Sequence, residues 1–172
     1  ERFSNGAVWP LFHYMPSQLP LRVEGWDEYY RVNQKFAQAV VEHYQPGAHV
    51  WVHDYQLMLV PNFVREQLPD ARIGFFLHIP FPGAEIFAVL PHREDILQGL
   101  LGADLIGFHT ARYRQHFETA LLRLLGRNTR NGTVKVGNRE VRIGVFPISI
   151  NAAQFEQRTA SADVMEEVEL LR

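Results

Sequence analysis

The sequence predicts an α/β protein built on an open parallel sheet, with helices on both faces. Short apolar runs rich in β-branched and aromatic residues alternate with longer segments whose apolar residues recur every three or four positions. This alternation is typical of βαβ units, in which a helix connects two parallel strands. Several of the strand-like runs end in polar residues, which indicates a binding crevice at one edge of the sheet.

Composition limits the class of protein. The 172 residues are 47% hydrophobic and 21% charged, which is ordinary for one globular domain. A formal net charge of −2 gives no electrostatic reason to expect nucleic acid or an anionic membrane as a partner. The sequence contains no cysteine, which excludes disulfides and thiolate metal sites, and no apolar run reaches the roughly 20 residues that span a bilayer. We therefore expect a cytoplasmic domain.

Apolar periodicity and end signals define the predicted helices. In the helix predicted for 26–44, Tyr29, Val32 and Phe36 recur at helical spacing. In the helix predicted for 55–68, Pro61 either makes a kink or starts a new turn. Gly126 ends the helix predicted for 111–126. The segment before the first helix is Pro-rich and is predicted to be irregular. The predicted helices are 26–44, 55–68, 83–91, 92–103 and 111–126.

The predicted strands are short, apolar and bounded by turn residues. A hairpin that turns at Gly137-Asn138 leads into the last of them, and from Asn151 a loop is followed by an acidic helix. The predicted strands are 48–53, 72–80, 104–109 and 143–147.

The first three strands end in "WVHD", "FFLHIP" and "IGFHT". Each is apolar until its last residues and then presents His, Asp or Thr. Because the carboxyl ends of parallel strands meet at one edge, where α/β proteins bind ligands, Asp54, His78 and His109 are candidate site residues. Thr110, which follows His109, is expected to cap the next helix, whose first amides could also receive an anionic group.

Each candidate has a structural alternative. Asp54 can cap the helix that follows it, bind a ligand, or do both. Its neighbour His53 points to the opposite side of the strand and is expected to be a packed, hydrogen-bonded structural residue. His78 lies in a run that should be fully buried, so its imidazole needs a partner from the protein, water or substrate. The following "IPFPG" favours a substrate, because its two prolines make a rigid loop.

An aromatic cluster precedes the first helix. Trp9, His13 and Tyr14 can be core residues, but aromatic rings also stack on sugar faces. No spacing of His and Glu makes a metal site, and no phosphate-binding loop or G-x-S-x-G motif is present. Exposed helix faces account for the remaining charged candidates, which are Glu85, Arg93, Glu94, Asp95, Arg112 and Arg114. The residues alone predict a polar crevice of undetermined function.

Six stretches resemble the trehalose-6-phosphate synthases, which are retaining glycosyltransferases of the GT-B architecture. They are "FSNGAVWPLFHY", "WDEYYRVNQKFA", "VWVHDYQLMLVP", "RIGFFLHIPFPGAEIFAVLP", "GLLGADLIGFHT" and "VFPISI", and they cover nearly the whole chain in family order. The resemblance implies transfer of glucose from UDP-glucose to glucose 6-phosphate, giving α,α-trehalose 6-phosphate and UDP. It implies front-face displacement with retention, without a covalent enzyme intermediate and without a metal or other cofactor.

The resemblance also implies where the chain belongs in a two-domain enzyme. Residues 1–150 would be part of an N-terminal Rossmann-like acceptor domain, and 151–172 a linker and helix leading to a C-terminal nucleotide-sugar domain outside this chain. The fragment alone is not expected to turn over substrate. A homo-oligomer stays open.

Site roles carry over by motif. Trp9 would help to bind glucose 6-phosphate, Asp54 would hydrogen-bond acceptor hydroxyls, and His78 would contact the transferred glucose near the reaction centre. His109 would line the crevice that faces the partner domain. Asp54 and His78 would thus be the catalytic pair.

The sequence departs from the family at Gln56, where "HDYHL" is common, at "PGAE" and at "ISIN". The family's glycine-containing donor loop, one acceptor-binding tyrosine and the Arg/Lys pair that binds the donor pyrophosphate would lie outside this chain. Two other functions stay open, a glucosylglycerol-phosphate synthase and a non-catalytic regulatory module.

Overall fold

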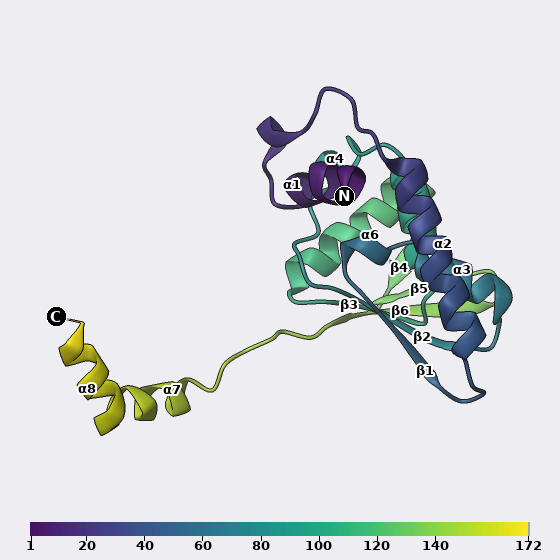
Figure 1. Cartoon of the computed structure of the whole chain (residues 1–172). Coiled ribbons are helices and arrows are strands. Elements are labelled where there is room, and N and C mark those ends of the chain that lie inside the picture. The colour runs from purple at the N-terminus through teal and green to yellow at the C-terminus, as the bar shows by residue number, and fades with distance from the viewer. Residues whose placement is uncertain (172) are drawn as a thin grey trace.

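The computed structural model describes residues 1–171 and contains a six-stranded sheet with helices packed on it (Figure 1). The strands are β1 (His49–His53), β2 (Arg72–Leu77), β3 (Leu105–Phe108), β4 (Thr129–Arg130), β5 (Thr133–Val136) and β6 (Arg139–Val145). The α-helices are α1 (Trp9–Phe12), α2 (Trp26–His43), α3 (Val60–Gln67), α4 (Ala84–Phe87), α5 (Arg93–Leu100), α6 (Ala111–Leu125), α7 (Ala152–Thr159) and α8 (Ala162–Leu170). Shorter helical turns are η1 (Ser4–Val8), η2 (Pro16–Gln18) and η3 (Tyr55–Leu57).

The sheet confirms the predicted α/β class. Its order is β1-β2-β3-β6-β5-β4, with β1, β2, β3 and β6 parallel and the last two antiparallel. The predicted hairpin is confirmed, since Val136 pairs with Arg139 across Gly137-Asn138. The short β4 was not predicted, although the Asn131-Gly132 turn that joins it to β5 is a strong hairpin signal.

Helices cover one face of the sheet within residues 1–171, and not both as predicted. Figure 1 shows α2, α3 and α6 on the same side. On the opposite face Trp51 is 69% exposed and Phe146 48% exposed. The order of the parallel strands explains this arrangement. Each step from β1 to β6 moves in the same direction, and right-handed crossovers in one direction place every connecting helix on the same face.

The segment after β1 divides at Pro61. A 3₁₀ turn, η3, comes first, and α3 then begins with Pro61 in its first turn, where a missing N–H is tolerated. This confirms the second alternative, in which a new turn begins at the proline.

Buried polar side chains of α2 hold the turn after β1. Tyr29 donates its hydroxyl to the Tyr55 carbonyl at 2.7 Å and accepts from the Met58 N–H at 3.2 Å. Asn33 is fully buried; its amide donates to the Gln56 carbonyl at 3.0 Å and its oxygen accepts from the Leu59 N–H at 3.1 Å. Burial raises the pKa of the Tyr29 phenol, so it stays a neutral donor. These bonds fix the chain that leaves Asp54.

An ion pair lies at the amino-terminal ends of β2 and β3, opposite the ends that carry Asp54, His78 and His109. Arg65 of α3 contacts Asp104 at 2.8 Å, and the second carboxylate oxygen of Asp104 accepts from the Ile73 N–H at 2.8 Å. Close helix packing lies beside it, since a Cβ at Gly102 would lie 2.3 Å from the Asn62 nitrogen. This edge of the sheet therefore has a structural role.

The C-terminal segment leads away from the sheet. After β6, residues 146–151 form an irregular stretch that leads to α7 and α8, which Figure 1 shows apart from the sheet. Ile148 and Phe155 are exposed along it. The division between 1–150 and 151–172 as domain and linker stays a prediction.

Candidate functional site

Three predicted site residues meet at the carboxyl edge of the sheet. The last residues of β1, β2 and β3 are aligned by parallel pairing, His53 with Phe76 and Leu77 with Phe108. Asp54, His78 and His109 are the next residues along the three strands.

Asp54 connects the ends of β1 and β2. Its backbone N–H donates to the Phe76 carbonyl at 2.9 Å, and its Oδ1 accepts from the His78 N–H at 3.2 Å. Its side chain makes no capping bond to η3, so the capping alternative is wrong for the carboxylate. Its backbone, at φ 71° and ψ 172°, lies in a region that is nearly restricted to glycine and costs about 1–3 kcal/mol. Such strain is typical of functional positions.

His78 is exposed and not buried as predicted, because it lies two residues beyond Phe76 on the face of the sheet that no helix within residues 1–171 covers. Its Nε2 lies 2.9 Å from Nδ1 of His53, and the two rings are stacked at 27° with centroids 5.2 Å apart. His53 is also exposed. The prediction that its side chain is packed is therefore wrong, while the predicted hydrogen bond is present.

The Phe76 ring contacts the rings of both His78 and His109, which also lie edge to face with their centroids 5.8 Å apart. Its centroid lies 4.8 Å from that of His78 and 4.9 Å from that of His109. The ring fits there because Gly107 beneath it has no side chain; a Cβ would lie 2.6 Å from the Phe76 ring. Nδ1 of His109 is buried and has no hydrogen-bond partner among residues 1–171. Next to it, Thr110 caps α6 as predicted, accepting from the Tyr113 N–H at 3.2 Å.

Trp9 lies on α1, is 41% exposed and contacts the residue that follows Asp54. The centroid of its ring lies 4.0 Å from the ring centroid of His13 and 5.5 Å from that of Tyr55. The His13 imidazole donates to the Trp9 carbonyl at 2.7 Å, and Tyr55 donates to Asn5 at 2.8 Å. Burial, and then the Asp54 charge, raise the pKa of Tyr55. The structure thus joins Trp9 to the turn that carries Asp54.

Tyr14 is not in ring contact with Trp9 and His13, and its side chain bonds the proline-rich loop 78–83. Its backbone has φ 59°, and its hydroxyl accepts from the Gly83 N–H at 2.8 Å. His116 of α6 donates to the Phe81 carbonyl at 2.8 Å from the other side. The loop after His78 is therefore held at Phe81 and at Gly83, which agrees with the rigidity predicted from "IPFPG".

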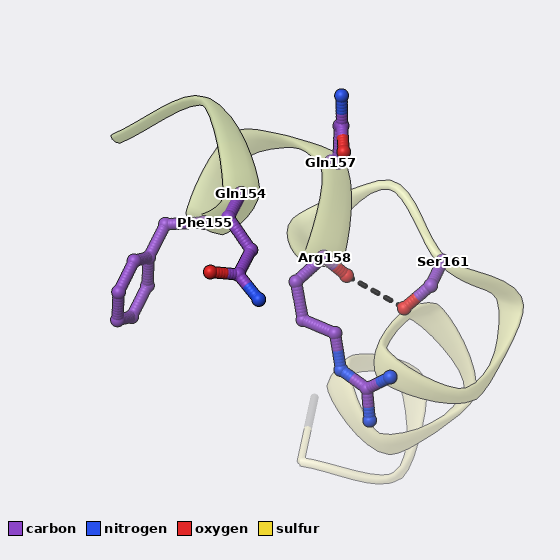
Figure 2. A pocket seen from close by; sticks show the side chains of 5 residues that line it. All are labelled: Gln154, Phe155, Gln157, Arg158 and Ser161. Atoms are coloured by element: carbon purple, nitrogen blue, oxygen red, sulfur yellow. Dashed lines mark hydrogen bonds between the residues drawn. The ribbon is translucent and has the colours of Figure 1, made fainter. Parts of the chain in front are cut away.

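The charged helical candidates lie outside this cluster. A backbone hydrogen bond, and then the ion pair with Arg123, hold the pKa of the Glu85 carboxyl below its usual range. Arg114 pairs with Glu118 at 3.1 Å. Arg112 is exposed and lines a pocket of about 420 Å³ beside Tyr14 and Pro80. A larger pocket, of about 530 Å³, lies on α7 and the turn after it, away from the strand ends (Figure 2).

Residues 1–171 contain no group of three or more His, Cys, Asp or Glu side chains that could hold a metal ion. No helix in that range is both long and apolar enough to cross a membrane.

Comparisons with known proteins give consistent results. A profile of glycosyltransferase family 20 matches residues 1–172. The chain is 45% identical over 170 residues to UDP-forming alpha,alpha-trehalose-phosphate synthase A of Dictyostelium discoideum, covering 99% of this chain and 23% of that protein.

Two solved structures are also similar. The N-terminal domain of Candida albicans trehalose-6-phosphate phosphatase matches with a TM-score of 0.86 at 33% identity, covering 98% of this chain and 37% of that one. A UDP-forming alpha,alpha-trehalose-phosphate synthase of Burkholderia xenovorans, in complex with glucose-6-phosphate, matches with a TM-score of 0.83 at 30% identity. This match covers 96% of this chain and 38% of that one. The chain thus spans less than half of each relative. Because the family profile matches its whole length, the chain belongs to glycosyltransferase family 20.

Proposed function

We propose that the full-length protein transfers glucose from UDP-glucose to glucose 6-phosphate with retention, giving α,α-trehalose 6-phosphate and UDP. This chain supplies the acceptor side of the site and depends on a C-terminal domain of the same protein for the donor. The observation that carries the proposal is the 3.2 Å hydrogen bond between Asp54 and His78 at the carboxyl edge of a family 20 sheet. The names of the synthase relatives support it.

Asp54 is suited to hold an acceptor hydroxyl. Its Oδ1 is occupied by the His78 N–H, while no hydrogen bond within residues 1–171 occupies its Oδ2. An ionised carboxylate only accepts hydrogen bonds, so Oδ2 is available to a sugar hydroxyl. The strained backbone points to a position selected for function rather than for stability.

The other three residues complete the acceptor side. The exposed Trp9 ring offers a flat apolar face to glucose 6-phosphate. His78 contacts the transferred glucose, and His109 lines the crevice toward the donor domain. Front-face displacement passes through an oxocarbenium-like transition state, for which the protein supplies alignment and charge stabilisation. Arg and Lys side chains that bind the pyrophosphate belong to the donor domain.

One comparison favours a second candidate function, a non-catalytic module with the fold of a synthase domain. The Candida albicans structure is named as the N-terminal domain of a phosphatase, so a similar fold occurs in a protein with a different named activity. A non-catalytic module would need neither the strained Asp54 nor the exposed Trp9 ring, and both are present.

A cytoplasmic location belongs to the main proposal and agrees with a sequence without cysteine.

UDP release by the full-length protein tests the proposal. With UDP-glucose and glucose 6-phosphate we expect UDP together with a non-reducing disaccharide phosphate. Glycerol 3-phosphate in place of glucose 6-phosphate is the control acceptor, and we expect it to give no UDP above the rate of donor hydrolysis. Release with glycerol 3-phosphate alone would assign a glucosylglycerol-phosphate synthase, and release with neither acceptor would assign a non-catalytic module.

A further inference from the structure

His53 and His78 form an imidazole pair at the carboxyl edge of the sheet. His53 is the last residue of β1 and pairs in register with Phe76, so His78 lies two residues farther along the same face. Nδ1 of His53 lies 2.9 Å from Nε2 of His78, within hydrogen-bonding distance. Neighbouring rings hold both imidazoles, with Trp51 4.5 Å from His53 and Phe76 4.8 Å from His78.

This bond constrains the proton positions on His78. A hydrogen bond between two neutral imidazoles needs one N–H donor and one bare nitrogen. If His53 donates, Nε2 of His78 is bare and its Nδ1 carries the proton. If His78 donates from Nε2, its Nδ1 is bare. In both cases Nε2 is engaged by His53, and Nδ1 is the ring nitrogen left for a ligand.

The backbone of His78 is fixed separately from its ring. Its N–H donates to Oδ1 of Asp54, which fixes the position of the main chain. Rotation of the side chain is limited by His53, by the Phe76 ring and by the His109 ring, whose centroid lies 5.8 Å from that of His78. His53 therefore controls a degree of freedom that Asp54 does not.

We propose that His53 is a positioning residue that couples the tautomer of His78 to its own and fixes the ring orientation of His78, and so leaves Nδ1 of His78 as the nitrogen that bonds a hydroxyl of the transferred sugar. The inference rests on the proposed function, because it takes His78 as the residue that contacts that sugar. The tautomer of a histidine is set by the hydrogen bond that its other nitrogen makes. Partners that orient metal-bound histidines typically contribute about 10- to 100-fold to metal affinity or activity, and we take the same order of magnitude for His53.

Three variants of the full-length protein separate positioning from packing. His53→Leu removes the ring nitrogens, and we expect kcat to fall about tenfold or more, with the KM for glucose 6-phosphate unchanged. His53→Asn places an amide near the Nδ1 position and should restore most of kcat. The matched control is His49→Leu, an exposed histidine on the same face of β1 four residues earlier, which should leave kcat unchanged. His53→Ala replaces His53→Leu if the latter aggregates.

Coupling to His78 is the decisive readout. In a His78→Ala background, His53→Leu should cause no further loss, because its effect passes through His78. The inference is overturned if the two losses multiply, if His53→Asn is as impaired as His53→Leu, or if His53→Leu has full activity.

A spectroscopic measurement separates failure of this inference from failure of the proposed function. Histidine ¹⁵N spectra of the full-length protein report the His78 tautomer whether or not the protein is active. We expect the His78 pattern to change in His53→Leu and to persist in His53→Asn. An unchanged pattern in His53→Leu would overturn the pairing even in an active synthase. A changed pattern in a protein without transfer activity would support the pairing while the proposed function fails.

Discussion

The carboxylate of Asp54 accepts a hydrogen bond from the backbone N–H of His78 at 3.2 Å, so a side chain from the end of β1 holds the end of β2. A backbone bond in the other direction, from the Asp54 N–H to the Phe76 carbonyl at 2.9 Å, continues the strand pairing to the same point. The two polar residues that the sequence places in separate segments are thus one structural unit.

Strain at Asp54 predicts an order of stability between two variants. Asp54→Ala and Asp54→Gly both remove the carboxylate, but only glycine adopts φ 71° and ψ 172° without strain. We expect Asp54→Gly to unfold at a midpoint about 2 °C or more above that of Asp54→Ala. Thermal unfolding of the two purified variants measures this difference. Equal midpoints would mean that the backbone relaxes and stores no strain.

Tyr29 predicts a coupling between α2 and the site. Tyr29→Phe leaves the Tyr55 carbonyl without its donor and the Met58 N–H without its acceptor, which should cost about 1–3 kcal/mol. Because this turn directly follows Asp54, activity should fall as well. The matched control is Tyr30→Phe, on the same helix but exposed, and it should be close to neutral. Urea unfolding and UDP release would measure both effects, and equal behaviour of the two variants would contradict the account.

Gly102 predicts a steric limit on the packing of α3 against the segment that follows α5. A Cβ there would lie 2.3 Å from the Asn62 nitrogen and 2.4 Å from the Pro61 carbonyl carbon, both backbone atoms that cannot move cheaply. We expect Gly102→Ala to destabilise by about 3 kcal/mol. Gly6→Ala, where nothing lies within 4 Å of the added carbon, is the control and should change stability little. A stable Gly102→Ala variant would show that the two segments can separate.

The sequence predicted much of the fold for identifiable reasons. The β1, β2 and β3 segments are apolar runs with polar ends, and this pattern was sufficient to place Asp54, His78 and His109 at one edge. Coverage of only one face could not be read from the pattern, because it depends on the order of the strands in space. The Asn131-Gly132 turn is a hairpin signal in the sequence, and the predicted strands do not include the β4 that it joins to β5.

The site was predicted in part. The burial expected for His78 is wrong, because its side chain lies on the uncovered face of the sheet, and an apolar run alone does not show that one face is uncovered. His53 was assigned a structural role because it points away from Asp54, but the pairing of β1 with β2 brings it against His78. Contacts of this kind depend on strand register, which neither segment encodes by itself.

The most direct test of the account compares UDP release by the full-length protein with that of two aspartate variants. We expect the wild-type protein and Asp70→Ala, an exposed aspartate before β2 at the opposite edge of the sheet, to release UDP from UDP-glucose and glucose 6-phosphate at similar rates. Asp54→Ala should abolish release while remaining folded. Release by Asp54→Ala at the rate of Asp70→Ala would contradict the account, because the carboxylate at the end of β1 would then have no part in the reaction.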